Sequence, residues 1–394
     1  MVSHKMAQAM EKGSFIRKMF EEGNRLRALH GADKVFDFSI GNPDLEPPAE
    51  VLTVLREQAA ATGSGLHGYM SNNGYPETRT AVAEWLNQPG LPEPLTPDLI
   101  CMTVGAAGAL NVALKAILDP DDEVIVLSPF FVEYTAYIDN QGGKCVVVPC
   151  LAETFQPDLP AIAAAITPRT KAIILNTPNN PTGTIYSAET LQALDALLQA
   201  QPQPIMAISD EPYSAIAFDG QTVPSTLANI QNMIMCYSWS KSLSLPGERI
   251  GFCAVSPRCP NAKQLAAACT YANRVLGFVN APALMQRVIT HVLNARVDVA
   301  RYESRRNALY DILTSCGFNA VCPAGGFYIF LKSPISDDLA FADACARHNV
   351  LLVPGQGFGY GGYVRLCFAV PDSTIAGSRS AFEKIAKEYG LKQY

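Results

Sequence analysis

Apolar runs that end at turn residues alternate with amphipathic stretches through the middle of the chain. The apolar runs are nearly continuous, and each stops at serine, asparagine, aspartate or proline: 123–127, 172–175, 205–208 and 233–237. Runs of this kind are typical of strands buried on both faces of a parallel sheet. The stretches between them repeat apolar residues with a helical period, as in 110–118 and in 191–198, where Ser187 is the expected N-cap. The alternation predicts an α/β fold with a mostly parallel sheet covered by helices.

The pattern changes after about residue 290. A long helical stretch over 282–316 comes first, and a last helix is expected over 378–389. Between them lie three strand-like runs, at 328–331, 350–353 and 363–368. Strands and helices in this order predict a smaller α+β part of the molecule.

Length and composition favour two domains. The chain has 394 residues, more than a single core usually reaches, so we expect a large domain over 45–290 and a small one formed by 1–44 and 291–394. Hydrophobic residues make up 48% of the chain and charged residues 17%, which allows a sizeable core. The net charge of -6 gives no reason to expect nucleic acid as a partner.

The cysteines and the N-terminal segment indicate a cytoplasmic protein. Most of the eleven cysteines lie in apolar runs, which is typical of small buried residues in a reducing compartment. No Cys-x-x-Cys pair is present and the five histidines are scattered, so we expect no metal site. Residues 1–12 are polar, unlike a secretory signal, and no window approaches the roughly 20 apolar residues of a membrane span.

The residues able to perform chemistry follow the predicted strands. Asn180 comes after one strand, Asp210 ends the next, and Tyr213 lies three residues on. Lys241 follows the strand after that, with Arg249 eight residues later. Ligands of open α/β sheets bind beyond the carboxyl ends of the strands, so these side chains are expected at one site. An amine that can form an imine, beside a cation that can hold a phosphate, is what pyridoxal phosphate requires.

A segment of small residues, 105–108, follows the strand at 101–104 and opens the next helix. Ala106 and Ala107 in this segment let backbone amides at a helix N-terminus face an anion. The alternative is tight packing of the helix on the strand. The segment is not Gly-x-Gly-x-x-Gly, which argues against a dinucleotide site and a nicotinamide-dependent dehydrogenase.

These motifs resemble those of the class I and II aminotransferases, the fold-type I enzymes of the aspartate aminotransferase type. The most specific pieces are Asn180-Pro181-Thr182-Gly183, Asp210-x-x-Tyr213 and Ser238-x-x-Lys241 with Arg249, and the resemblance runs from residue 38 to Arg365. It implies a homodimeric transferase of nitrogenous groups that depends on pyridoxal phosphate. Such an enzyme moves the amino group of an L-amino acid to a 2-oxo acid by a ping-pong mechanism.

The resemblance also implies roles around the cofactor ring. Lys241 would hold the cofactor as a Schiff base and move a proton at the substrate, and Asp210 would keep the pyridine nitrogen protonated. Tyr213 and Asn180 would hydrogen-bond the phenolic oxygen. Phe131 would stack on the ring, with Phe130 as the alternative.

At the phosphate, the resemblance implies Ser238, Arg249 and the segment with Ala106 and Ala107 as ligands. Tyr69 would reach the phosphate of the neighbouring subunit; the alternative is a loop tyrosine that packs locally.

For the substrate, Arg365 would bind the α-carboxylate, with help from Asn180 and the backbone of Gly41. Arg365 lies in an apolar strand, where an unpaired cation is costly, so it needs an anionic partner; a structural salt bridge is the alternative. Residues 14–17 would cover the site with Phe15 and Ile16, unless 16–29 is an ordinary amphipathic helix. The motifs at 323–328 and 353–359 look structural.

Shared cofactor motifs leave the reaction and the substrate open. A C–S β-lyase or a related lyase uses the same cofactor residues. A non-catalytic regulator domain would need a DNA-binding module or a basic patch, and neither is evident. A second carboxylate on the donor would need another cation, for which Arg274 and Arg17 are candidates by position; Phe15 and Ile16 favour a neutral, apolar or aromatic donor.

Overall fold

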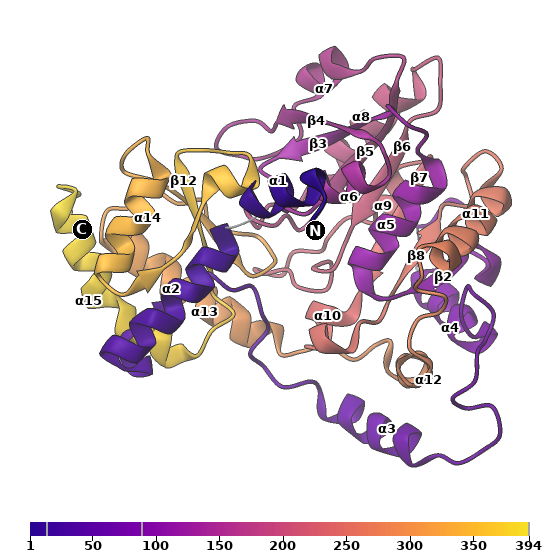
Figure 1. Ribbon diagram of the computed structural model, residues 1–394, viewed down its shortest axis with the longest axis horizontal. Coiled ribbons are helices and arrows are strands. Elements are labelled where there is room, and N and C mark those ends of the chain that lie inside the picture. Colours follow the sequence, from indigo (N-terminus) through magenta and orange to yellow (C-terminus); the bar gives the residue numbers. More distant parts are fainter. Residues whose placement is uncertain (13–14, 88–89, 393–394) are drawn as a thin grey trace.

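The computed structural model describes residues 1–12, 15–87 and 90–392, and for residues 8, 9, 11, 12, 15–21, 30 and 32 it describes the backbone alone. Its centre is a seven-stranded sheet in the order β2-β8-β7-β6-β5-β3-β4 (Figure 1). The strands are β2 (Ile100–Thr103), β3 (Glu123–Ser128), β4 (Lys144–Pro149), β5 (Thr170–Asn176), β6 (Met206–Asp210), β7 (Met233–Ser238) and β8 (Gly251–Val255). Strands β4, β3, β5, β6 and β7 are parallel, and β8 is antiparallel to both of its neighbours. The predicted α/β fold with a mostly parallel sheet is confirmed.

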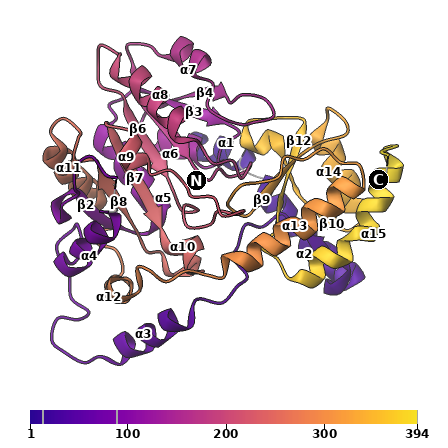
Figure 2. The ribbon, with the colours of Figure 1, turned by 180° about the vertical axis from the view of Figure 1, so that it is seen from behind.

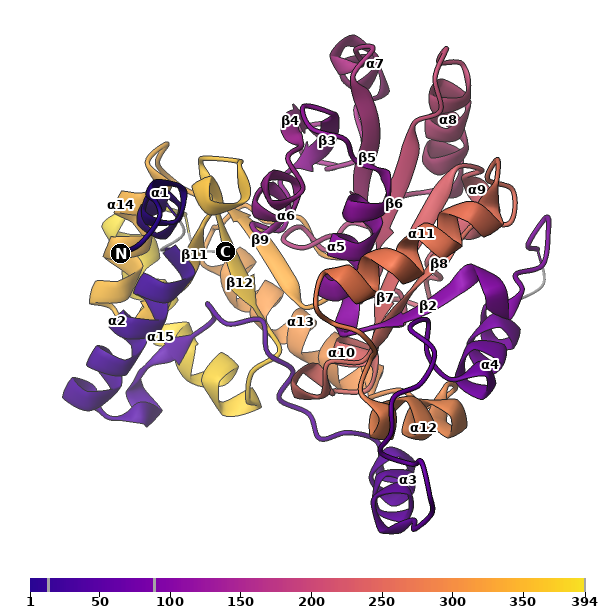
Figure 3. The same ribbon diagram turned by 45° about the vertical axis from the view of Figure 1, so that its right-hand side comes forward.

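Helices cover this sheet. α5 packs against β7 and β8, and α11 packs against α5 and β2 (Figures 1 and 3). The helices of this part are α5 (Gly105–Ile117), α6 (Tyr134–Asn140), α7 (Leu159–Ala165), α8 (Ala188–Gln199), α9 (Thr226–Asn229), α10 (Trp239–Ser242) and α11 (Ala262–Val275). The Ser187 side chain accepts a hydrogen bond from the Thr190 amide at the start of α8, which confirms the expected N-cap.

A second group of elements lies beside the sheet, as Figures 1 and 2 show. A three-stranded antiparallel sheet has the order β11-β12-β9, and β1 pairs with β10 in parallel. The elements are β1 (Phe36–Asp37), β9 (Tyr328–Lys332), β10 (Val350–Leu351), β11 (Val353–Pro354), β12 (Tyr363–Cys367), α13 (Val299–Ser315), α14 (Asp338–Arg347) and α15 (Asp372–Glu388). One large apolar cluster surrounds the seven-stranded sheet, and another lies between the small sheet and α13, α14 and α15.

The N-terminal third supplies the remaining helices. They are α1 (His4–Lys12), α2 (Phe15–His30), α3 (Ala49–Ala60) and α4 (Pro76–Leu86), with α12 (Ala283–Val292) later in the chain. The amphipathic helix considered for 16–29 is present as α2. α3 lies at the periphery in all three views and packs against α12 (Figures 1, 2 and 3).

Three expected boundaries were wrong. The helix expected over 282–316 is two helices, because α12 ends at Val292 and Asp298 caps a new helix by accepting from the Arg301 amide. The last helix starts at Asp372 rather than at residue 378, directly after Pro371, which suits a helix start. The strand expected over 350–353 is divided, since its first half pairs with β1 and its second half with β12.

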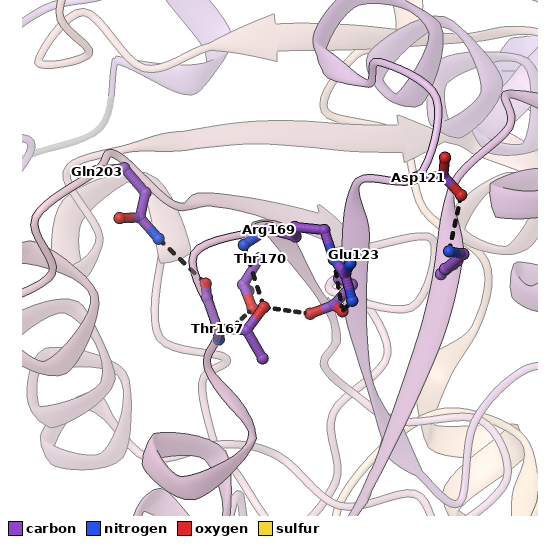
Figure 4. A network of polar contacts seen from close by, with 7 residues as sticks. Asp121, Glu123, Thr167, Arg169, Thr170 and Gln203 are labelled. Atoms are coloured by element: carbon purple, nitrogen blue, oxygen red, sulfur yellow. Dashed lines mark hydrogen bonds and ion pairs between the residues drawn. The ribbon is translucent and has the colours of Figure 1, made fainter.

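Polar contacts of Glu123 link the amino ends of β3 and β5, at the end of the sheet opposite to the site described below (Figure 4). Glu123, the first residue of β3, accepts hydrogen bonds from Thr167 at 2.5 Å and from Arg169 at 3.0 Å. Its backbone amide donates to the Arg169 carbonyl at 2.8 Å. The turn before β5 is thereby tied to the start of β3.

Cysteine burial follows the sequence-based expectation closely. All eleven cysteines are free thiols; Cys145 is half-buried, Cys322 is exposed, and the others are buried. Among the described residues, no helix is long and apolar enough to cross a membrane, and no group of three or more metal-binding side chains comes together.

Candidate active site

A cavity of about 290 Å³ lies beyond the carboxyl ends of β5, β6 and β7, toward the lower end of the size range of small-molecule sites. Eleven of the residues proposed from the sequence line it: Gly41, Ala106, Ala107, Phe131, Asn180, Asp210, Tyr213, Ser238, Lys241, Arg249 and Arg365. Residues from both apolar clusters therefore meet at one place, as expected for groups at the carboxyl edge of an open sheet.

Lys241 lies on α10, the single turn that follows β7. Its Nζ atom donates a hydrogen bond to the Gly41 carbonyl at 2.8 Å. Burial lowers the pKa of Lys241 to about 8, and the cations of Arg365 and Arg249 act in the same direction. A substantial fraction of the amine is therefore neutral near physiological pH, which is the form that attacks a carbonyl.

Asp210 ends β6 and has two oxygens in different environments. Oδ2 accepts a hydrogen bond from the Tyr134 hydroxyl at 2.6 Å, whereas Oδ1 is buried and has no hydrogen-bond partner among the residues that the structure describes. Burial raises the pKa of Asp210 to about 6, against the lowering effects of the Tyr134 bond and of Lys241. An unsatisfied buried oxygen is costly, so Oδ1 is suited to a ligand that donates a proton or a hydrogen bond.

The Arg249 side chain lies beside the start of α5, where its Nη2 atom donates a hydrogen bond to the Val104 carbonyl at 3.3 Å. Its backbone is in the left-handed region at φ 51°, a conformation that costs a non-glycine residue on the order of 1 kcal/mol and concentrates at functional sites. A Cβ on Gly105 would lie 2.8 Å from Arg249 Nη2, so the glycine lets the guanidinium approach the helix N-terminus. Together with Ser238, these groups form an anion-binding end of the cavity.

Arg365, on β12, is 4% exposed and lies between two aromatic rings. Its guanidinium carbon is 4.4 Å from the centroid of Tyr328 and 4.8 Å from that of Phe358. Nη1 donates to Asn180 Oδ1 at 3.1 Å and Nη2 to the Ser39 carbonyl at 2.8 Å, while Nε has no partner in the described part of the chain. No carboxylate among the described residues pairs with Arg365, which argues against a structural salt bridge and leaves the cation available to an anionic ligand.

Tyr213 and Tyr328 place their hydroxyl oxygens 3.1 Å apart at the wall of the cavity. Burial raises the pKa of both phenols, so both stay protonated at neutral pH. Gly41 passes so close to the Tyr328 hydroxyl that no Cβ fits there. The backbone of this segment, rather than a side chain, therefore faces the cavity at residue 41.

The family model described as "Aminotransferase class I and II" matches residues 33–380. The chain belongs to this family. It is 34% identical over 359 residues to the aspartate/prephenate aminotransferase of Thermus thermophilus, covering 89% of this chain and 90% of that protein. It is 30% identical over 392 residues to aromatic-amino-acid aminotransferase 2 of Thermococcus litoralis, covering 97% and 98%. A crystal structure of an aminotransferase from Eubacterium rectale superimposes with a TM-score of 0.94 at 40% identity, covering 99% of each chain.

The protein is therefore a pyridoxal-phosphate-dependent aminotransferase, which moves an amino group between an amino acid and a 2-oxo acid. The names of these relatives all describe amino transfer, so the lyase alternative is not favoured. The cavity fits the cofactor on its own chemistry. It offers an amine of lowered pKa, a cationic end and one unsatisfied carboxylate oxygen, which correspond to the aldehyde, the phosphate and the pyridine nitrogen of pyridoxal phosphate.

The structure distinguishes Phe131 from Phe130 by position and places Tyr69 outside the cavity. Phe131 lines the aminotransferase cavity, whereas Phe130 is buried against Gly359. Tyr69 is 94% exposed on the connection between α3 and α4 and does not line the cavity of its own chain. Arg274 is exposed and also lies away from the lining. Ser14 and the side chains of residues 15–17, expected to cover the site, lie outside the described residues.

Sequence reasoning missed several groups at or beside the cavity. Tyr137, Ser240 and Tyr328 line the cavity, and Tyr134 contacts Asp210 from behind. The motifs at 323–328 and 353–359 were interpreted as structural, and this was incomplete, because Tyr328 and Phe358 enclose the Arg365 guanidinium. The aromatic residues at the ends of these motifs were the available signal.

Proposed function

We propose that Lys241, Asp210 and Arg365 perform the amino transfer of this enzyme at a single cavity. The observation that supports this most directly is that the amine of Lys241 and the free oxygen of Asp210 face the same cavity. When bound, pyridoxal phosphate supplies an aldehyde for amines and a ring that accepts electrons from the substrate Cα. Lys241 would hold the cofactor at its aldehyde, and its amine would take and return the proton at the substrate Cα.

The other groups bind and orient. Asp210 Oδ1 would accept a hydrogen bond from the pyridine nitrogen and keep it protonated, and Tyr213 and Asn180 would hydrogen-bond the phenolic oxygen. Arg249, Ser238 and the amides around Ala106 and Ala107 bind the phosphate, and Phe131 stacks on the ring. Arg365 binds the substrate carboxylate through two parallel hydrogen bonds, beside Asn180 and the backbone of Gly41.

Replacement of the amine tests this assignment. Lys241→Ala should abolish turnover and the visible absorbance of the bound cofactor. Lys263→Ala removes an exposed lysine from the surface of α11 and should change neither. Normal turnover by Lys241→Ala would disprove the assignment.

We infer a homodimer in which Tyr69 reaches the phosphate in the neighbouring subunit. Its 94% exposure in the single chain supports this, because a large aromatic side chain on a surface loop is suited to a contact with another chain. Mixing inactive Tyr69→Ala and Lys241→Ala proteins tests the inference. One site of each mixed dimer would hold both intact residues, so activity should return on mixing; its absence would argue against a shared site.

We also propose that the amino donor has an uncharged side chain. Among the described residues that line the cavity, the cations are Lys241, Arg249 and Arg365, and each already has a role above. A screen of amino donors against 2-oxoglutarate tests this, and a strong preference for aspartate would overturn it.

We also propose a cytoplasmic location, which the free thiols support. We propose a division into one domain at 45–290 and another formed by 1–44 and 291–394, which the two apolar clusters support.

A further inference from the structure

Asp37, at the end of β1, accepts three hydrogen bonds from two residues and does not line the cavity. Its Oδ1 accepts from the Ser39 amide at 3.0 Å and from the Ser39 hydroxyl at 2.6 Å. Its Oδ2 accepts from Arg27 Nη2 on α2 at 2.5 Å. The Asp37 side chain is 9% exposed, so these bonds form largely away from water and hold the carboxylate in place.

The residue that Asp37 holds is in turn a partner of the substrate-binding arginine. The Ser39 carbonyl accepts from Arg365 Nη2 at 2.8 Å, and Ser39 is only 1% exposed. Ser39 and Gly41 both line the cavity. A short chain of contacts therefore runs from Asp37 through Ser39 to the Arg365 guanidinium.

The in-plane orientation of Arg365 depends on these contacts. The rings of Tyr328 and Phe358 lie 4.4 and 4.8 Å from the guanidinium carbon and restrict the plane of the group. Rotation within that plane is limited by two acceptors, Asn180 Oδ1 and the Ser39 carbonyl. A bidentate carboxylate contact tolerates about 10–20° of misalignment, so a displaced Ser39 carbonyl would weaken it.

We propose that Asp37 is a positioning residue for substrate binding, which sets Arg365 through the Ser39 backbone. The proposal rests on the proposed role of Arg365 as the site of the substrate carboxylate. Two donors of Ser39 on one carboxylate oxygen form a local turn that fixes the chain just before the cavity wall. If this turn is lost, the restraints next to Ser39 are two backbone hydrogen bonds of Phe38. Its amide donates to the Leu351 carbonyl at 2.9 Å, and its carbonyl accepts from the Cys367 amide at 2.8 Å.

A simpler role for Asp37 is to fasten α2 to β1 through Arg27. The two roles predict different variants to be harmful. If fastening is what matters, Arg27→Gln and Asp37→Ala lower stability alike and leave substrate binding unchanged. If positioning is what matters, Asp37→Ala weakens carboxylate binding, whereas Arg27→Gln keeps both bonds from Ser39 and binds normally.

The experiment uses the enzyme loaded with its cofactor. The dissociation constants of succinate and 3-phenylpropionate, two carboxylates without an amino group, are measured by calorimetry alongside kcat and KM for the best amino donor. Asp37→Ala should raise the dissociation constant of whichever carboxylate binds, and the donor KM, by about 10-fold, with the cofactor absorbance unchanged. Arg27→Gln should stay within about twofold of the unmodified enzyme, and Asp37→Asn, which retains an acceptor for Ser39, should recover most of the loss.

Two further variants keep the outcome decisive. Ser39→Ala removes only the hydroxyl bond to Asp37 and should weaken carboxylate binding in the same direction by a smaller factor, even if Asp37→Ala fails to fold. In an Arg365→Ala background, Asp37→Ala should cause no additional loss, because its effect passes through Arg365. If Arg365→Ala itself leaves carboxylate binding intact, the proposed role of Arg365 is wrong; if only the Asp37 and Ser39 variants bind normally, the positioning role alone is wrong.

Discussion

The Tyr134 hydroxyl lies 2.6 Å from Oδ2 of Asp210, and both residues are buried. Burial raises the pKa of the Tyr134 phenol well above its ordinary value, so the hydroxyl is a donor throughout the neutral range. This bond assigns the two carboxylate oxygens of Asp210 to different tasks. Oδ2 is held by the protein, and Oδ1, which has no hydrogen-bond partner among the described residues, is the oxygen proposed to meet the ring nitrogen of the cofactor.

We expect Tyr134→Phe to lower kcat about 10- to 100-fold. A hydrogen bond to a charged group contributes about 1.5–3 kcal/mol, and without it Asp210 is both less well oriented and less readily ionised. Because the bond lowers the pKa of Asp210, its loss should raise that pKa and move the acidic limb of the kcat profile to higher pH. The measurement is kcat between pH 5 and 9 with saturating substrates.

Tyr237→Phe is the matched control for this variant. The Tyr237 hydroxyl is also buried and lies 2.9 Å from Ser242 Oγ, but its partner is neutral and it does not line the cavity. The control should lose comparable stability with kcat within about twofold of the unmodified enzyme. Equal losses of kcat in the two variants would show that Tyr134 acts only through packing.

The lowered pKa of Lys241 predicts how its reactivity depends on pH in the cofactor-free protein. With a pKa of about 8, roughly one tenth of the amine is neutral at pH 7 and about nine tenths at pH 9. The rate of acetylation of Lys241 should therefore rise over this interval and level off above it. Peptide mass spectrometry after brief labelling with acetic anhydride measures the rate, and the exposed Lys263 in the same digest corrects for loss of reagent. Labelling that stays negligible until pH 10 would contradict the burial effect.

Much of the fold and most of the cavity were predictable because their signals are local. The four predicted strands of the parallel part of the sheet are short apolar runs with a polar stop, and the stop itself supplies the functional group at Asp210 and Ser238, whereas the more exposed β4 was not predicted. Family motifs then added Arg365, which lies far away in the chain. The apolar run of a strand and the polar residue that ends it are adjacent in the sequence, so both can be predicted from the same few residues.

The contacts that tune these groups were not predictable, since both partners must first be placed in space. Tyr134 and Asp210 are 76 residues apart, and nothing near either residue indicates the other. Arg365 and Ser39 are separated by 326 residues, and their contact involves a backbone carbonyl that has no sequence signature. The break between α12 and α13 was missed for a related reason. In the sequence, Asp298 is an ordinary polar residue within a helical pattern. Its role as an N-cap, which accepts from the Arg301 amide, is evident only in the structure.

Asp210→Asn should stabilise the cofactor-free protein at high pH. The pKa of Asp210 is raised from 3.8 to about 6 by burial, so the folded state disfavours its charged form. The resulting penalty is complete above pH 6 and disappears as the pH falls toward 3.8, and it corresponds to up to about 3 kcal/mol. Asparagine has the same shape, can accept the Tyr134 bond and is never charged.

Urea unfolding of the cofactor-free proteins measures this effect. The variant should be more stable than the unmodified protein at pH 8, with a smaller difference at pH 5. Addition of pyridoxal phosphate should reverse the order, because the charged carboxylate then has its partner. A variant that is less stable than the unmodified protein at pH 8 without cofactor would show that burial of the charged Asp210 carboxylate does not destabilise the protein.

Replacement of Glu123 tests whether the amino ends of the strands, away from the cavity, contribute to stability rather than to activity (Figure 4). Its carboxylate is 7% exposed and accepts from the Thr167 hydroxyl and from Arg169, and these bonds lower its pKa. Because the pKa is lowered, the stabilisation is present above the ordinary value of 4.5 and is lost as the pH falls below it. The Arg169 side chain is 61% exposed, so most of the contribution comes from the partly buried Thr167 bond.

Glu123→Gln should therefore lower the free energy of unfolding by about 1 kcal/mol at pH 7, with kcat and KM unchanged, and the difference should shrink at pH 3.5. Lys144→Gln is the matched control at the same edge. It breaks an ion pair with Asp121 whose side chains are 54% and 68% exposed, and an exposed pair of this kind contributes little. Chemical denaturation at both pH values, with activity assays on the same samples, separates the two variants. Equal destabilisation by both would mean that surface charge, rather than the buried Glu123–Thr167 bond, holds this edge of the sheet.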